Sequence, residues 1–153
     1  MRRPGLTFIE LIVILAILAL LATFVIPTFD LILNQLELNT AISQVQDLLR
    51  LTEQRTVTEQ KNYYVSFNTG GQIITQYVEN TSGGSDQVVS TITLPSSIVV
   101  DSLAFGGATT VRFATTGAPS VSGSLVLLDT GRIRHRKIDV RPSGSVVADG
   151  SEY

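Results

Sequence analysis

The 153 residues include one histidine and no cysteine, and their formal net charge is −2. A chain of this length has room for one small folded domain after an apolar N-terminal run, and no disulfide can stabilise that domain. A metal site built from a histidine pair and a cysteine nucleophile are both excluded. The G-x-S-x-G and G-x-x-x-x-G-K motifs are also absent. We therefore expect no enzymatic activity and no cofactor.

A long apolar run dominates the start of the chain. Residues 11–29 are 19 consecutive uncharged residues. As a helix they would be ~28 Å long, about the thickness of the hydrocarbon core of a bilayer. We therefore predict a transmembrane helix over residues 6–29, after a basic leader over residues 1–5. Glu10 lies at the start of the run, where a carboxylate is costly unless it meets a cation or reaches the interface.

Two ordinary interpretations compete for this run. A cleaved secretory signal is disfavoured because the run is too long and its alanines are never two residues apart. A plain single-pass anchor, with Arg2 and Arg3 inside and Glu10 snorkelling to the head groups, is physically adequate and stays open.

The residues around the start of the run carry a resemblance. A short basic leader ends in Gly5, Leu6 follows, and Glu10 stands four places further on. This pattern resembles the class III signal of type IV pilins and type II secretion pseudopilins. The resemblance implies that a membrane aspartyl protease, the prepilin peptidase, cuts after Gly5 and N-methylates Leu6, although the family usually has Phe at that place. It also implies that Glu10 acts in assembly by meeting the terminal amine of a neighbouring subunit, and that Pro27 marks the point where such helices loosen in a filament.

From residue 30 onward the apolar pattern becomes periodic. Apolar side chains recur at steps of three and four residues, with polar residues between them, at Leu38, Ile42, Val45, Leu48 and Leu49. This spacing is typical of an amphipathic helix. Because no glycine interrupts it, we predict that residues 30–61 continue the first helix.

Residues 62–153 are expected to form an antiparallel β domain, because their pattern changes to period two with turn residues between the runs. A hairpin is predicted over 63–67 and 72–78, with glycines in its turn. Further strands are expected at 87–94, 109–114, 123–129, 134–141 and 145–148, while residues 99–107 are left unassigned. The expected fold class is α+β: a long N-terminal helix, with a transmembrane half and an amphipathic half, packed on one antiparallel sheet.

A basic cluster lies in the C-terminal part. Residues 131–153 contain five basic and three acidic residues, whereas residues 6–130 contain four and ten. On a strand, Arg132, Arg134 and Arg136 would share one face, and with Lys137 they would give a phosphate-binding rail for DNA. The favoured alternative is a solvated edge strand whose positive charges discourage edge pairing, or a set of cross-strand pairs with Asp129 and Asp139. Contact with an acidic partner subunit is the third interpretation.

The C-terminal half adds a looser resemblance. Phe113 with Gly117, the step Gly131-Arg132-Ile133-Arg134, and Pro142-Ser143-Gly144 resemble H-type minor pseudopilins and FimT-type minor pilins. The two resemblances together imply a pilin-like fold and a minor subunit that assembles through its N-terminal helix into a type II secretion pseudopilus or a type IV pilus. The alternative is a minor pilin of a DNA-uptake pilus that binds DNA through the arginine cluster.

The resemblances also imply partners and a location. The partners would be other pilin or pseudopilin subunits, the prepilin peptidase, an inner-membrane assembly platform and the membrane itself, with DNA in the alternative case. The subunit would cross the cytoplasmic (inner) membrane once, with its C-terminal domain outside the cytoplasm, and then enter the filament.

Overall fold

The computed structural model describes residues 7–131 and 134–149, with the side chains of residues 24–34 left out of the description. These residues form one helix and eight strands: α1 (Phe8–Glu59), β1 (Tyr63–Phe67), β2 (Ile73–Val78), β3 (Gln87–Thr93), β4 (Ile98–Ala104), β5 (Thr110–Phe113), β6 (Gly123–Asp129), β7 (Arg134–Val140) and β8 (Val146–Ala148). The chain divides into two compact units, Met1–Leu36 and Glu37–Tyr153.

The first unit contains the N-terminal part of α1. Its helical backbone includes Pro27, the position predicted to loosen in a filament. Among the residues that the structure describes, no helix is long and apolar enough to be identified as crossing a membrane. The transmembrane helix expected over residues 6–29 therefore stays a prediction.

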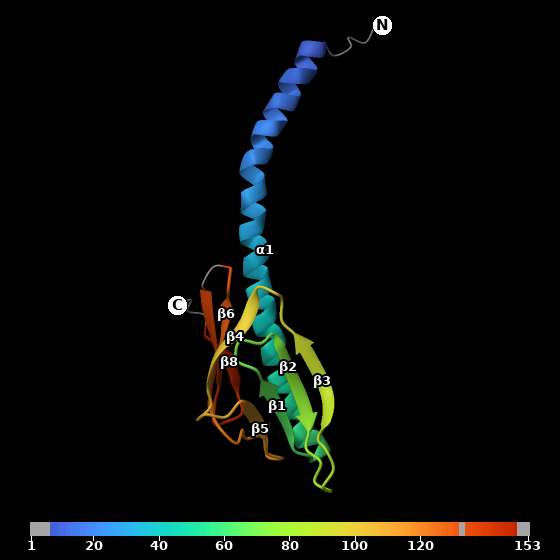
Figure 1. The fold of residues 1–153 in the computed structure, drawn as a ribbon, viewed down its shortest axis with the longest axis vertical. Helices are drawn as coiled ribbons and strands as arrows, with labels where there is room; N and C mark the ends of the chain where they lie inside the picture. Colours follow the sequence, from blue (N-terminus) through green and yellow to red (C-terminus); the bar gives the residue numbers. More distant parts are fainter. Residues whose placement is uncertain (1–6, 132–133, 150–153) are drawn as a thin grey trace. The chain divides into compact units, whose positions relative to one another are not determined.

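The second unit contains two four-stranded antiparallel sheets, with strand orders β3-β2-β1-β5 and β4-β6-β7-β8 (Figure 1). The expectation of one sheet is wrong. The unassigned segment around residues 99–107 contains β4, which pairs with β6, and the chain then returns to the first sheet because β5 pairs with β1. The β4–β6 register shifts between Val100 and Ser102. This irregularity breaks the period-two pattern by which β4 could have been predicted.

The C-terminal half of α1 provides one wall of the core. Its buried side chains follow the helical spacing expected from the sequence: Leu38, Ala41, Ile42, Val45, Leu48, Leu49, Thr52 and Thr56. The buried amide of Gln76, on β2, donates to the Thr52 hydroxyl at 3.0 Å. This bond satisfies a polar group inside the core and ties β2 to the helix.

The remaining elements agree with the sequence-based expectations to within a few residues. The helix ends at Glu59 instead of residue 61, and Gln60 follows it with a φ of 52°. The predicted hairpin is present as β1 and β2, and its turn uses Gly70 at a φ of 74°. The α+β fold with a long helix on antiparallel strands is thereby confirmed.

Candidate functional site

The N-terminal end of α1 carries the predicted assembly residue. Gly5 and Leu6, the predicted cleavage and methylation positions, lie outside the described residues. Glu10 is exposed in the first turn of α1, and its backbone N–H donates to the Thr7 hydroxyl at 3.3 Å. The Thr7 carbonyl accepts from the N–H of Leu11 at 3.2 Å, which places Thr7 at the N-cap. Thr7 and Glu10 thus have the spacing of a capping box.

This arrangement gives Glu10 a local role that the sequence analysis missed. A carboxylate in the first turn is favoured by the helix dipole. The Thr-x-x-Glu spacing before an apolar run was the signal that could have revealed it. Any test of Glu10 in assembly must therefore separate its charge from its effect on the helix start.

The first turns of α1 expose a continuous apolar surface. Phe8 is 80% exposed and Ile9 71% exposed, and large apolar side chains remain exposed as far as Leu21. A contiguous exposed apolar surface that extends over several helical turns is typical of surfaces that lipid or other proteins cover. This surface and Glu10 form the candidate assembly site.

The predicted basic cluster is divided between two faces of β7. Arg132 lies outside the described residues. Arg134 and Arg136 alternate with the same parity as Ile138 and Val140, which are buried, so they lie on the inner face of the sheet. Arg136 donates to the Asn39 side-chain oxygen of α1 at 3.3 Å and to the Asp149 carbonyl at 3.2 Å. Its guanidinium therefore helps to hold β7 against the helix.

Lys137 lies on the outer face, where its ammonium is 3.0 Å from the Asp139 carboxylate. His135 shares this face, with its Nδ1 3.7 Å from the Asp101 carboxylate. The interpretation of β7 as an edge strand is wrong, because it pairs with both β6 and β8. The structure therefore brings Arg134 and Arg136 together but places Lys137 on the opposite face.

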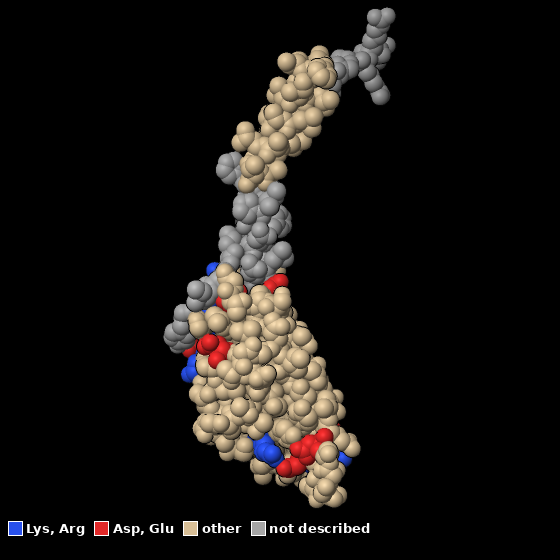
Figure 2. Space-filling view, in the orientation of Figure 1, with Lys and Arg blue, Asp and Glu red and all other residues tan. Residues whose placement is uncertain are grey.

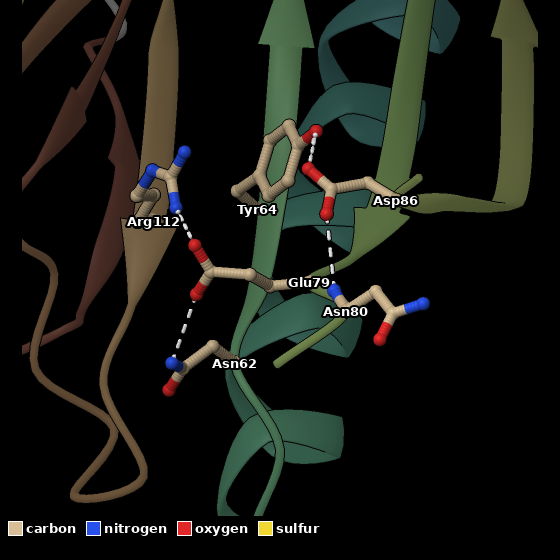
Figure 3. A network of polar contacts seen from close by, with 6 residues as sticks. All are labelled: Asn62, Tyr64, Glu79, Asn80, Asp86 and Arg112. Atoms are coloured by element: carbon tan, nitrogen blue, oxygen red, sulfur yellow. Dashed lines mark hydrogen bonds and ion pairs between the residues drawn. The ribbon is translucent and has the colours of Figure 1, made fainter. Parts of the chain in front are cut away.

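A polar network covers the outer face of the first sheet (Figure 3). The rings of Tyr64 and Tyr77 stack with centroids 5.0 Å apart, and the Arg112 guanidinium lies 4.8 Å from the Tyr64 centroid. Arg112 also pairs with Glu79, whose other oxygen accepts from the Asn62 amide at 2.9 Å. These contacts join β5, β1 and the end of β2 in one row.

The same network fixes the loop between β2 and β3. The Tyr64 hydroxyl donates to Asp86 at 2.7 Å, and the backbone N–H of Asn80 donates to the other Asp86 oxygen at 3.0 Å. Burial and the hydrogen bond to Asp86 raise the pKa of Tyr64 to about 12. The backbone hydrogen bond from Asn80, followed by the bond from Tyr64, lowers the pKa of Asp86.

Within the described residues, no group of histidine, aspartate and glutamate side chains is placed to hold a metal ion.

Two glycines of the looser C-terminal pattern meet over α1. Gly117 and Gly144 have φ values of 85° and 87°. A Cβ at Gly144 would lie 2.6 Å from both the Gly117 carbonyl oxygen and the Glu53 Oε1. Burial raises the pKa of Glu53, and the nearby Arg50 opposes this shift. The turn glycines therefore serve close packing of two loops on the helix, which the sequence pattern alone could not reveal.

The chain resembles one protein family and several solved structures. A family model described as type II transport protein GspH matches residues 41–144. The minor pseudopilin EpsH from the type 2 secretion system of Vibrio cholerae has a similar fold, with a TM-score of 0.63 and 13% identity over 74% of this chain and 98% of that chain. The type IV minor pilin FimU of Pseudomonas aeruginosa also has a TM-score of 0.63, with 10% identity over 78% of this chain and 94% of that chain. No curated protein matches the chain at a significant level.

Proposed function

Because the chain belongs to the GspH family of type II transport proteins, we propose that it is a minor pseudopilin or pilin subunit that assembles through the N-terminal part of α1 into a type II secretion pseudopilus or a type IV pilus. The observation that carries the proposal is the combination of this family with an exposed apolar helix surface from Phe8 to Leu21. Other subunits of the filament would cover that surface after assembly, and lipid would cover it before. The role is structural and needs no catalytic residue.

The proposal includes processing and a location. The prepilin peptidase cuts after Gly5 and methylates Leu6, and an inner-membrane assembly platform then moves the subunit from the membrane into the filament. Before assembly the chain crosses the cytoplasmic (inner) membrane once, and residues 37–153 lie outside the cytoplasm. The new terminal amine of one subunit meets Glu10 of a neighbour, and Pro27 allows the helix to loosen as it packs.

Mass analysis of the N-terminus tests the processing step directly. The membrane-extracted chain should begin at Leu6, with or without an added methyl group. A Gly5→Arg variant serves as the control and should keep Met1, because a bulky charged side chain replaces the small residue at the cut. A wild-type chain that begins at Met1, or near Ala22, would contradict the pilin interpretation.

DNA uptake is the second candidate function, and the two arginines that share the inner face of β7 favour it only weakly. The Arg136 guanidinium already bonds Asn39 and Asp149. Lys137 lies on the opposite face and pairs with Asp139. DNA contact would therefore require these bonds to be exchanged for phosphate contacts. In this case the logarithm of the association constant for duplex DNA should fall linearly with the logarithm of the salt concentration. The slope should be roughly −0.9 for each phosphate that the protein neutralises. Arg134→Ala should weaken binding and Arg50→Ala should not; equal loss from both, or no binding at low salt, excludes this role.

A further inference from the structure

The four edges of the two sheets differ in how they are protected. The Phe113–Pro119 bridge and a hydrogen bond from Ser120 to the Arg112 carbonyl cover β5. The turn at Gly70 and Gly71 exchanges two hydrogen bonds with Val100 and so covers β4. Strand β8 has only three residues. In the part of the chain that the structure describes, β3 has seven residues and pairs with β2 alone.

The sequence of β3 lacks the charged residues and prolines that commonly protect an edge strand, and its one irregularity is a register shift opposite Gln76 and Tyr77. Its residues, QVVSTIT, include no charge, proline or glycine, and five of the seven are β-branched. Figure 2 shows that the visible surface over β2 and β3 carries no charged side chain down to the lower end of the domain. Natural edge strands are commonly blunted by lysine, proline or a covering loop. The open side of β3 is therefore suited to pairing with another strand.

The orientation of the backbone supports this conclusion. Leu94 donates its N–H to the Gln72 carbonyl at 2.7 Å, and Thr93 stands opposite Ile73 in the register. In an antiparallel ladder successive residues direct their backbone groups to alternate sides. The backbone groups of Thr91 and Thr93 therefore point away from β2, toward the open side.

A groove runs beside this edge, between β3 and α1. Its volume is about 380 Å³, and it is lined by Gln44, Asp47, Leu48, Leu51, Ser90, Ile92 and Thr93. Ser90 and Ile92 lie opposite the buried Gln76 and Ile74, so they belong to the inner face of the sheet. A strand added to β3 would continue this inner face, and its alternate side chains would enter the groove above Leu48 and Leu51.

We propose that β3 is a docking edge for an extended strand of a different protein, with apolar side chains at alternate positions and one lysine or arginine facing Asp47. A strand can form hydrogen bonds with the backbone groups on the open side of β3, which a helix cannot do. A second copy of β3 fits less well, because it has no basic residue to meet Asp47, the one charged residue among those lining the groove. The proposal does not depend on the assembly role of the N-terminal helix.

The direct test is binding of a defined peptide to the full chain in detergent. The probe is a labelled, acetylated and amidated heptapeptide, Thr-Val-Thr-Val-Thr-Lys-Thr, which places two valines and the lysine on one face. Fluorescence anisotropy should detect saturable binding. N-methylation of the two probe amides that face β3 should weaken it about tenfold, because two hydrogen bonds are lost. Failure to bind at millimolar probe, or equal binding after N-methylation, overturns the proposal.

A charge exchange tests the groove. Asp47→Lys changes an exposed residue. It should lower the affinity for the lysine peptide a few-fold and raise the affinity for a peptide with glutamate at the same position. Asp101→Lys, on β4, is the matched control and should change neither affinity. If the two variants had equal effects, or if Asp47→Lys did not reverse the preference for the lysine peptide over the glutamate peptide, the probe would bind elsewhere.

A cysteine variant tests the competing occupant. The chain has no cysteine, so Thr91→Cys introduces one thiol, at the open edge. Under mild oxidation the purified variant should remain monomeric on a non-reducing gel. Rapid formation of a Thr91→Cys disulfide dimer, together with loss of probe binding, would identify a second copy as the occupant and overturn the proposal.

Discussion

Three segments of the domain lie close together at Gly144. Its neighbours are Gly117, in the turn after β5, and Glu53, on α1. Gly83, in the loop before β3, has nearly the same φ, 85° against 87°, but a Cβ there would meet nothing within 4 Å. Substitutions at these two glycines therefore distinguish the cost of a strained backbone from the cost of a steric clash.

We predict that Gly144→Ala destabilises the chain more than Gly83→Ala. The left-handed backbone should cost each variant about 1–2 kcal/mol. Gly144→Ala should lose a further 1–3 kcal/mol, roughly, because its methyl group meets a backbone carbonyl that cannot move away cheaply. Thermal unfolding of the detergent-solubilised chain, followed by circular dichroism, measures both. Equal unfolding temperatures for the two variants would show that the loops can separate from the helix without cost.

A second residue-scale prediction concerns alkaline pH. The pKa of Tyr64 is raised from 10.0 to about 12 by burial and by the bond to Asp86. The folded state therefore favours the neutral phenol, and this stabilisation is complete below pH 10 and is lost as the pH rises through about 12. In Tyr64→Phe, the unfolding temperature should fall less steeply over this interval than in the wild type. Tyr77→Phe retains the Tyr64–Asp86 bond and should keep the wild-type slope; a similar flattening in both variants would contradict the assignment.

Some residue positions could have been read from the sequence more fully. Alternation correctly places Arg134 and Arg136 on one face, but the same alternation groups them with Ile138 and Val140, and this apolar pair identifies the inner face. The contact of Gly144 with Glu53 could not be predicted, because it joins positions about ninety residues apart through the packing of two sheets. Local patterns identify a turn, but they do not say what the turn packs against.

The elements with regular periodicity were predicted well. The buried stripe of α1 from Leu38 to Leu49 and the β1–β2 hairpin follow the spacing of the sequence. Strand β4 was missed because its register shift breaks the alternation, and without it the second sheet could not be separated from the first. The division into two sheets is a property of long-range pairing, on which short sequence windows give no information.

At the scale of elements, we predict that residues 37–153 fold without the N-terminal unit. This segment contains the buried stripe of α1 and both sheets, and it includes every buried apolar residue that the structure describes. The purified segment should be monomeric and should unfold in one cooperative transition. A matched segment that begins at residue 50 lacks most of the helical wall and should fail to fold. An aggregated 37–153 segment without a transition would show that the domain depends on its neighbours.

At the scale of the whole molecule, the two units differ in whether their apolar side chains are buried or exposed. The second unit buries them between α1 and two sheets, whereas the described side chains before residue 24 remain exposed. The proposed function would thereby separate stability and assembly along one helix: its C-terminal part packs on the sheets, and its N-terminal part would contact lipid and then other subunits. Substitutions in the first turns should therefore alter assembly without unfolding the domain.

The last prediction uses Glu10 to separate charge from helix capping. Glu10→Leu removes both the carboxylate and the capping-box side chain, whereas Glu10→Gln removes the charge and keeps a side chain suited to the third helical position. If the carboxylate meets a neighbour's amine, both variants should enter the membrane normally and be depleted from filaments by more than about tenfold, because leaving one partner of a buried pair alone costs roughly 3–5 kcal/mol. Quantitative immunoblotting of membrane and sheared-filament fractions measures the distribution. Normal filament levels of Glu10→Gln with loss of Glu10→Leu would assign Glu10 to the helix start alone, and normal levels of both would remove it from assembly.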